Sequence, residues 1–236
     1  MVMATIRWQT PSSGGYAITE WEIEPRATAL LLLDLQTGNV DPERGCGPEL
    51  RSRFPREAGY YYDSLRNRGL AAAAELLGFF RGQRLPVVHA HSGLALPDGR
   101  DVAGWSWRAQ LAGRPATIPC LLPPGDPDGE AWPDLTPLEG ELVLLKQTLS
   151  PFNGTALDQY LRNMGVQNLV LAGVLTNGAV ESTARNAGDR GFNAIVAADA
   201  CAAFSPEDQQ AGTLFASWHI VRSAREIVDE LAPLLA

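Results

Sequence analysis

Short apolar runs alternate with amphipathic stretches along most of the chain. The runs contain few polar residues, which is typical of strands covered on both faces of a sheet. They lie at 27–35, 85–91, 141–146, 166–174, 192–200 and 218–223. The stretches between them predict helices at roughly 66–83, 153–165, 177–191, 205–217 and 224–235. This alternation predicts a mostly parallel sheet with right-handed crossovers, so we expect a doubly wound three-layer α/β sandwich of about six strands.

Two segments interrupt the pattern. Residues 36–50 (QTGNVDPERGCGPEL) are rich in Gly and Pro and predict a loop. Residues 92–140 are irregular over a length that, inside a compact domain, is usually functional or disordered. Their tryptophans argue for order, because disordered segments tend to lack aromatic residues. We interpret this stretch as a lid or interface arm of a single domain covering 1–236.

Charge and cysteine content narrow the class of protein. The net charge of −8 argues against nucleic acid or an anionic membrane as the main partner. The three cysteines, Cys46, Cys120 and Cys201, are widely spaced and suggest neither a disulfide framework nor a zinc ribbon. No signal-peptide pattern opens the chain, and no apolar run is long enough to span a bilayer. We therefore expect a cytoplasmic protein that binds a small molecule.

Polar side chains mark the carboxyl ends of the predicted strands: Asp34, His89 and His91, Lys146, and Asp199. Ligands of this architecture bind at that edge, which we call the rim. An ionised Asp34 after four leucines is costly unless it is paired, and Lys146 would pair with it. Lys146 is also the only lysine among the 19 Lys and Arg residues. The two form either a structural ion pair or an acid/base pair beside a nucleophile.

The turn GVLTNGA (173–179) follows the fourth of these strands and opens a predicted helix. At a helix start, unpaired N–H groups and the helix dipole favour negative charge. A cysteine there would have a lowered pKa, and a substrate carbonyl would find an oxyanion hole. The residue in that position is Ala179, which carries no nucleophile.

These residues belong to a longer pattern. The chain reads a lysine, then Ser-x-Phe, then Gly-Thr before a helix, then GVLTNGAV, then STAR, then Asp-Ala-Cys. Together with ALLLLDLQ, this resembles the cysteine hydrolases of the isochorismatase-like superfamily. That superfamily includes nicotinamidases, N-carbamoylsarcosine amidohydrolases, ureidoacrylate amidohydrolases and biuret hydrolases. The resemblance covers most of the chain, and every element of the motif is present except the cysteine that Ala179 replaces.

The resemblance implies an Asp–Lys–Cys triad that cleaves an amide-type bond through a thioester. Asp34 would be the general base, Lys146 would hold it and stabilise negative charge, and position 179 would carry the nucleophile. It also implies an oxyanion hole from the backbone N–H groups of Leu175 and Ala179. A non-proline cis peptide bond would join Val174 to Leu175.

Ala179 admits two interpretations. One is an engineered Cys-to-Ala change, and the other is a natural member of the family that lost its thiol. Lyase-type relatives also lack the cysteine and act on a vinyl ether with an aspartate acid. The intact Asp34 and Lys146, and the helix sequence VESTARNA, favour the engineered change. With alanine in place, little or no amidase activity is expected.

Several further residues are expected near the substrate, although each could equally serve packing: Gln36, His91, Phe152, Trp105, Trp107 and Asn177. Gln36 would share the face of Asp34 if the strand continued. Thr176 and Asn177 are expected to shape the turn through side-chain to backbone hydrogen bonds. The spacing of His89 and His91 does not match the metal site of nicotinamidases, so we expect no metal and no cofactor. Glu181 and Arg185 should pair across one helical turn.

Three functions remain open from the sequence. The first is an amidohydrolase of a small amide, ureido, carbamoyl or lactam compound. The second is a vinyl-ether hydrolase that uses Asp34 as its acid. The third is a binding or assembly subunit without activity. Relatives often assemble, so the resemblance implies a homodimer or homotetramer.

Overall fold

A computed structural model of the chain describes residues 4–7, 20–102, 120–215 and 220–236. Its main sheet has six strands in the order β5-β4-β3-β6-β7-β8, and every neighbouring pair is parallel. The bounds are Thr28–Leu33 (β3), Val87–Ser92 (β4), Leu142–Lys146 (β5), Asn168–Val174 (β6), Asn193–Ala202 (β7) and Ile220–Arg222 (β8). The predicted doubly wound α/β architecture is confirmed.

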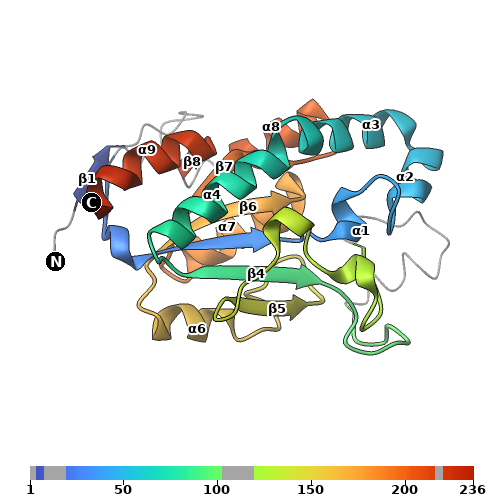
Figure 1. Cartoon of the computed structure of the whole chain (residues 1–236), viewed down its shortest axis with the longest axis horizontal. Helices are drawn as coiled ribbons and strands as arrows, with labels where there is room; N and C mark the ends of the chain where they lie inside the picture. Colours follow the sequence, from blue (N-terminus) through green and yellow to red (C-terminus); the bar gives the residue numbers. More distant parts are fainter. Residues whose placement is uncertain (1–3, 8–19, 103–119, 216–219) are drawn as a thin grey trace.

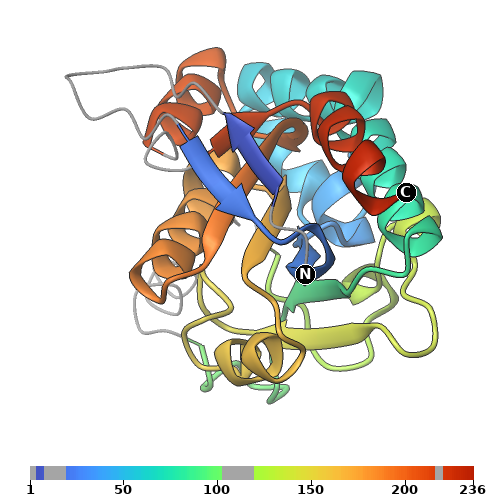
Figure 2. The same cartoon turned by 90° about the vertical axis from the view of Figure 1, so that its left-hand side faces the viewer.

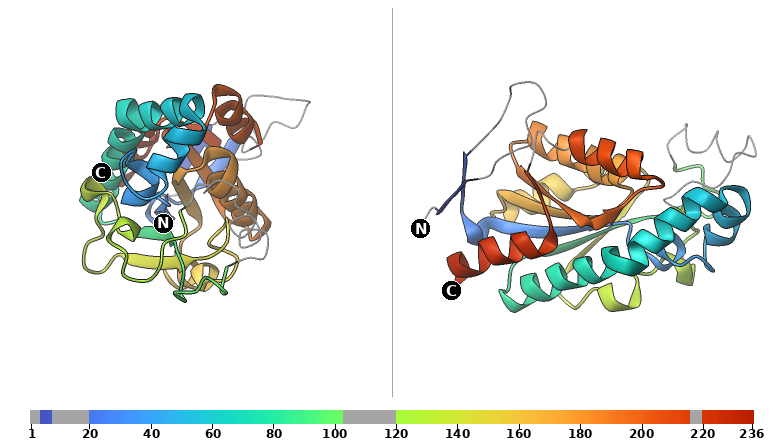
Figure 3. Two further views of the ribbon diagram at one scale, coloured as in Figure 1. Left: turned by 90° about the vertical axis from the view of Figure 1, so that its right-hand side faces the viewer. Right: turned by 90° about the horizontal axis from the view of Figure 1, so that it is seen from above.

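Helices cover both faces of this sheet (Figure 1; Figure 3, right). One layer contains α3 (Pro55–Ser64), a π-helical stretch (Leu65–Gly69), α4 (Leu70–Gly82) and α9 (Ala224–Leu235). The other contains α6 (Leu157–Asn163) and α7 (Glu181–Asp189), while α8 (Pro206–Phe215) packs on the turn before α7.

The pleat of β3 distributes its leucines between two hydrophobic cores. Leu30 and Leu32 pack into the core under α4 and α9, whereas Leu31 and Leu33 pack into the core under α6 and α7. Alternation of this kind is expected because successive side chains of a strand point to opposite faces. All six residues of β3 are buried, as the continuous apolar run predicted.

Three local features differ from what the sequence pattern indicated. The expected loop at 36–50 contains α1 (Thr37–Val40) and the start of α2 (Gly47–Arg53), which has a proline in its first turn. The helix expected from about residue 66 begins at Pro55, again with proline in its first turn. The main-sheet strands are preceded by an antiparallel pair, β1 (Ala4–Arg7) and β2 (Glu20–Ile23), which the pattern did not indicate.

The β1–β2 pair lies at the amino ends of the main strands, and the rim lies at the opposite end (Figures 1 and 2). The described part of the predicted lid segment contains two short 3₁₀ helices, η3 (Pro127–Gly129) and η4 (Pro133–Leu135). Trp105 and Trp107 lie outside the described residues, so their predicted role stays a prediction. None of the helices that the structure describes is long and apolar enough to cross a bilayer.

Candidate functional site

Asp34 and Lys146 meet at the rim in a fully buried ion pair. Asp34 directly follows β3, and Lys146 is the last residue of β5. Because β4 lies between those strands, the lysine side chain crosses the end of β4 to reach the carboxylate. Its Nζ donates to Asp34 Oδ2 at 2.8 Å and to Thr148 O at 3.1 Å. Both side chains have an exposed fraction of 0%.

The Asp34 backbone is held in an unusual conformation. Its φ is 57°, in the left-handed region that a residue with a Cβ rarely adopts. The conformation is fixed by two hydrogen bonds, one from Asp34 N to Ala90 O and one from Asn39 Nδ2 to Asp34 O, each 2.9 Å long. Such residues persist only where the surroundings enforce them, and they cluster at functional sites.

The two carboxylate oxygens of Asp34 differ in their surroundings. Oδ2 is held by Lys146, whereas Oδ1 is buried and has no hydrogen-bond partner among the described residues. Burial raises the pKa of the Asp34 carboxyl, and the Lys146 ammonium acts in the opposite direction. Lys146 therefore fixes one oxygen of the carboxylate, and the other has no hydrogen bond among the described residues.

The turn after β6 stands next to Asp34, because β6 is the immediate neighbour of β3. Leu33 pairs with Gly173, whose φ is 138°. A Cβ at residue 173 would lie 2.0 Å from Leu33 O, so only glycine allows the two strands to approach this closely.

A cis peptide bond joins Val174 to Leu175, as the resemblance implied. A π-helical turn, η5 (Thr176–Val180), follows and continues into α7. Gly178 N and Val180 N donate to Leu175 O at 3.0 and 3.2 Å, which closes the turn around Ala179. Ala179 is 1% exposed. The oxyanion role of the Leu175 and Ala179 N–H groups stays a prediction.

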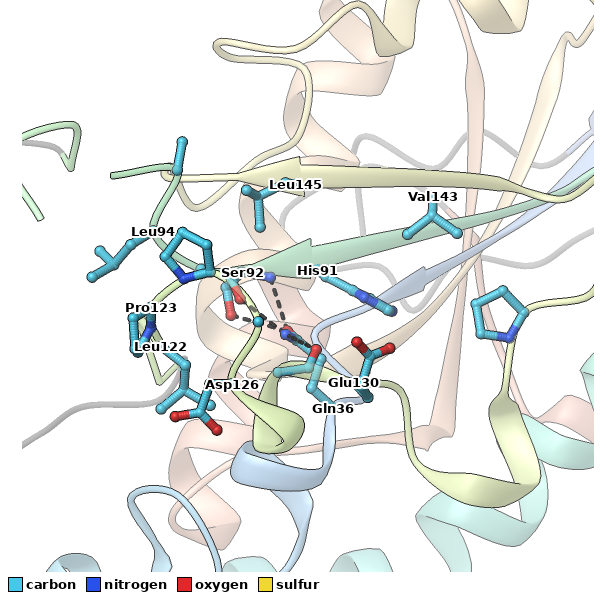
Figure 4. Close-up of a pocket in the computed structure, with 16 residues that line it drawn as sticks. Gln36, His91, Ser92, Leu94, Leu122, Pro123, Asp126, Glu130, Val143 and Leu145 are labelled. Carbon is cyan, nitrogen blue, oxygen red and sulfur yellow. Dashed lines mark hydrogen bonds between the residues drawn. The ribbon is translucent and has the colours of Figure 1, made fainter. Parts of the chain in front are cut away.

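A cavity of about 520 Å³ opens beside the ion pair (Figure 4). Gln36, His91 and Ser92 line it, so two of the predicted substrate-binding residues face a cavity. None of Asp34, Lys146 or Ala179 lines it. The Gln36 side chain is bound to the end of β4: its Nε2 donates to Ser92 O at 2.9 Å, and its Oε1 accepts from Ser92 N at 2.8 Å.

Gln36 lines the cavity, but not as part of a continuing strand, as was predicted. The strand does not continue past Leu33, and Gln36 instead forms an isolated bridge to Ala131. Its Nε2 also donates to Gly129 O at 2.7 Å, which fastens the described end of the lid segment to the rim.

Sequence reasoning missed Ser92 and Asn39. Ser92 ends β4 and is the register partner of Lys146, and its place after His91 at a strand end was an available signal. Asn39 joins distant segments: its Oδ1 accepts from Cys120 N at 2.7 Å, and its backbone O accepts from Tyr61 Oη at 3.0 Å. No sequence signal marked Asn39, because two of its partners, Tyr61 and Cys120, lie far away in the chain.

The remaining site predictions have mixed outcomes. Phe152 packs in the core with its ring 5.8 Å from that of Phe192, and it does not line the cavity. Asn177 is exposed and also lies outside the cavity lining. Thr176 Oγ1 donates to Gln209 Oε1 at 2.7 Å, so its expected bond to the turn backbone was wrong. Glu181 and Arg185 form the predicted pair.

Asp199 was wrongly placed at the rim. Strand β7 continues past it to Ala202, and Asp199 Oδ1 accepts from Ala224 N at 2.7 Å. The carboxylate therefore serves the first turn of α9.

His89 is buried with its Nε2 3.0 Å from Glu141 Oε2. Within the described part of the chain, no three His, Cys, Asp or Glu side chains gather closely enough to hold a metal ion.

We expect His91 to make the free energy of unfolding depend on pH. Burial lowers the pKa of His91 from 6.5 to about 4, and His89 and Lys146 add to the shift. The folded state then stays neutral where the unfolded state binds a proton, so stability is lost as pH falls through that window. The loss should be about 2 kcal/mol between neutral pH and about pH 5.

Urea unfolding of the parent and of His91→Gln at these two pH values measures this effect. The variant should show a smaller loss. Glu141, whose pKa is lowered to about 2, titrates below this window, and His89, whose pKa burial also lowers, is present in both proteins. An identical pH dependence in both proteins would contradict the assignment.

Comparison with known proteins finds a family model and several relatives that cover most of the chain. The isochorismatase domain model matches residues 28–225. The uncharacterized isochorismatase family protein YecD of Escherichia coli O157:H7 is 31% identical over 89% of this chain and 99% of its own. The ureidoacrylate amidohydrolase RutB of Pseudomonas syringae pv. syringae is 30% identical over 82% of this chain and 78% of its own. The crystal structure of N-carbamoylsarcosine amidase from Thermoplasma acidophilum aligns with a TM-score of 0.61 and 26% identity, over 84% of this chain and 96% of that one.

Proposed function

The chain belongs to the isochorismatase family, and from this premise we propose that its rim is built to hydrolyse the C–N bond of a small amide, ureido, carbamoyl or lactam compound. The observation that carries the proposal is the buried Asp34–Lys146 pair, whose Oδ1 has no partner among the described residues. It stands beside a turn that would suit a thiol nucleophile. The names of the ureidoacrylate and N-carbamoylsarcosine relatives support the same class of bond.

The proposed chemistry needs a cysteine in place of Ala179. Asp34 Oδ1 would take the thiol proton while Lys146 holds Oδ2. The sulfur would then form a bond to the carbonyl carbon, and the N–H groups of Leu175 and Ala179 would stabilise the oxyanion. Breaking the C–N bond returns the proton to the leaving amine or ammonia. Water then attacks the thioester, which releases the acid and restores the thiol.

We propose that the chain itself is an inactivated variant of such a hydrolase. A methyl group at residue 179 cannot attack a carbonyl. The three cysteines do not supply a substitute at this turn, because the thiols of Cys46 and Cys120 contact Gly38 O and Cys201 packs in the core under α6 and α7. Burial raises the pKa of Cys201 to about 12, and the neighbouring Cys46 thiol, together with burial, raises the pKa of Cys120, so neither favours the reactive thiolate.

A vinyl-ether hydrolase is the second candidate, and one observation favours it. Burial raises the pKa of Asp34, which favours the protonated carboxyl that an acid catalyst needs. Such a reaction requires no thiol, so the chain could perform it with Ala179 in place.

Trapping the covalent intermediate separates these candidates. Ala179→Cys protein and the parent would be mixed with a panel of small amides, ureides and lactams, quenched in acid, and analysed by peptide mass spectrometry. We expect an acyl adduct on the peptide that contains residue 179, in the variant only. Turnover of vinyl ethers by the parent, with no adduct in either protein, would favour the second candidate. No turnover and no adduct would favour a binding subunit.

A further inference from the structure

The cavity beside the ion pair offers a ligand an apolar wall and acidic groups (Figure 4). Val143 and Leu145 of the edge strand β5 form one side, and they remain 48% and 46% exposed. Leu122 stands across from them on the described part of the lid segment. A groove with this composition suits a short aliphatic body.

The polar side chains that remain free to meet a ligand are mostly acceptors. Glu130 and His91 make no hydrogen bond through their side chains to any residue that the structure describes. Asp126 uses one oxygen, which accepts from Asp128 N at 2.9 Å, and keeps the other. Gln36 and Ser92 are occupied by their mutual bonds.

The charge of the described lining has one sign. Two carboxylates, those of Asp126 and Glu130, face the cavity, and none of the described lining residues is Lys or Arg. His91 stays neutral near pH 7, because burial lowers its pKa. Its neutral imidazole therefore adds one acceptor, one N–H donor and no positive charge. An anionic ligand would be repelled, whereas a ligand with several N–H donors and a positive charge would be matched.

A metal ion does not fit this lining as well as an organic cation does. No three candidate ligand side chains come together among the described residues, so the lining lacks the cluster of ligands that holds a metal ion. An ammonium group instead needs only one or two close acceptors and can leave its carbon chain on the apolar wall.

We infer that this cavity binds a small organic cation, an alkylammonium compound whose charged head lies between Glu130 and His91 and whose chain lies on Val143, Leu145 and Leu122. The inference does not rest on the proposed hydrolysis, because it concerns binding alone and uses none of Asp34, Lys146 or Ala179.

Titration of isotope-labelled protein with pentylammonium, followed by amide chemical shifts, tests this inference. The shifts should move at Gly93, Gly125 and Gly129, which line the cavity. Pentanoate, of similar length and opposite charge, should not move them. Pentan-1-ol, which keeps the chain and loses the charge, should bind at least about fivefold more weakly, since hydrogen bonds to charged groups are the stronger ones.

Two matched variants locate the charged head. Glu130→Gln removes an exposed carboxylate that lines the cavity, and pentylammonium should then bind at least about fivefold more weakly. Glu139→Gln makes the same change at an exposed glutamate outside the lining and should leave the affinity unchanged.

Three results would overturn the inference. One is the absence of shifts at the cavity glycines, including the case in which a second copy of the chain covers this face. Another is equal affinity for pentylammonium and pentan-1-ol. The third is an equal loss of affinity in the two glutamine variants. It would mean that the affinity for pentylammonium depends only on the net charge of the protein, which is −8.

Discussion

The Ala179→Cys protein is expected to hydrolyse its amide substrate at least about 10⁴-fold faster than the Ala179 chain. The gain is large because the thiol supplies a covalent route that nothing else in the described rim provides. Asp34 and Lys146 are already in contact at 2.8 Å. The substitution therefore completes an existing arrangement. Ammonia release over a panel of small amides, ureides and lactams is the measurement.

Double variants show whether the gain uses the proposed triad. Adding Asp34→Asn to Ala179→Cys should remove most of the gain, because the amide has no carboxylate to take the thiol proton. Ala179→Ser should recover little, because a hydroxyl is a weaker nucleophile than a thiol beside a single carboxylate. Equal ammonia release by Ala179→Cys and the parent would contradict the thiol mechanism. It would mean that Asp34 catalyses the reaction without a thiol.

The sequence predicted the parts of the site that depend on strand order along the chain. A buried run ending in Asp34, another ending in Lys146 and a glycine-containing turn after the next run all lie at carboxyl ends of parallel strands. Their meeting at one rim follows from that rule alone. The rule does not state which strands are neighbours, so it could not show that Lys146 crosses β4 to reach Asp34.

The predictions that failed depend on partners distant in the chain. The role of Asp199 could not be predicted from its strand, because its carboxylate accepts a hydrogen bond from Ala224 N, 25 residues later. Thr176 is bound by Gln209 of α8 in the same way. The glycines and prolines of residues 36–50 indicated a loop, but Asn39 of α1 is bound to Cys120, 81 residues later. Local pattern carries no information about such contacts.

Lys146→Met is expected to lower the free energy of unfolding by about 3–5 kcal/mol near neutral pH. The reason is that the Asp34 carboxylate would stay fully buried without a counter-charge. Replacing both partners, Lys146→Met with Asp34→Asn, should recover most of the loss, because no buried charge remains. Urea unfolding of the two single variants, the double variant and the parent closes the cycle.

The loss of stability caused by Lys146→Met should change with pH in one direction. Burial raises the pKa of Asp34, and Lys146 is the main group that opposes the shift, so Lys146→Met should raise it further. A carboxyl with a folded pKa above its unfolded value contributes stability at low pH that is lost as pH rises through the folded pKa. The deficit of Lys146→Met should therefore shrink as the pH is lowered.

As a control, Arg53→Met breaks an exposed pair with Glu49 and should change stability far less at every pH. The contradicting result is a small effect of Lys146→Met that does not change with pH and equals that of the control. It would mean that the Asp34–Lys146 pair is solvated. The rim would then lack the desolvated base on which the hydrolase proposal depends.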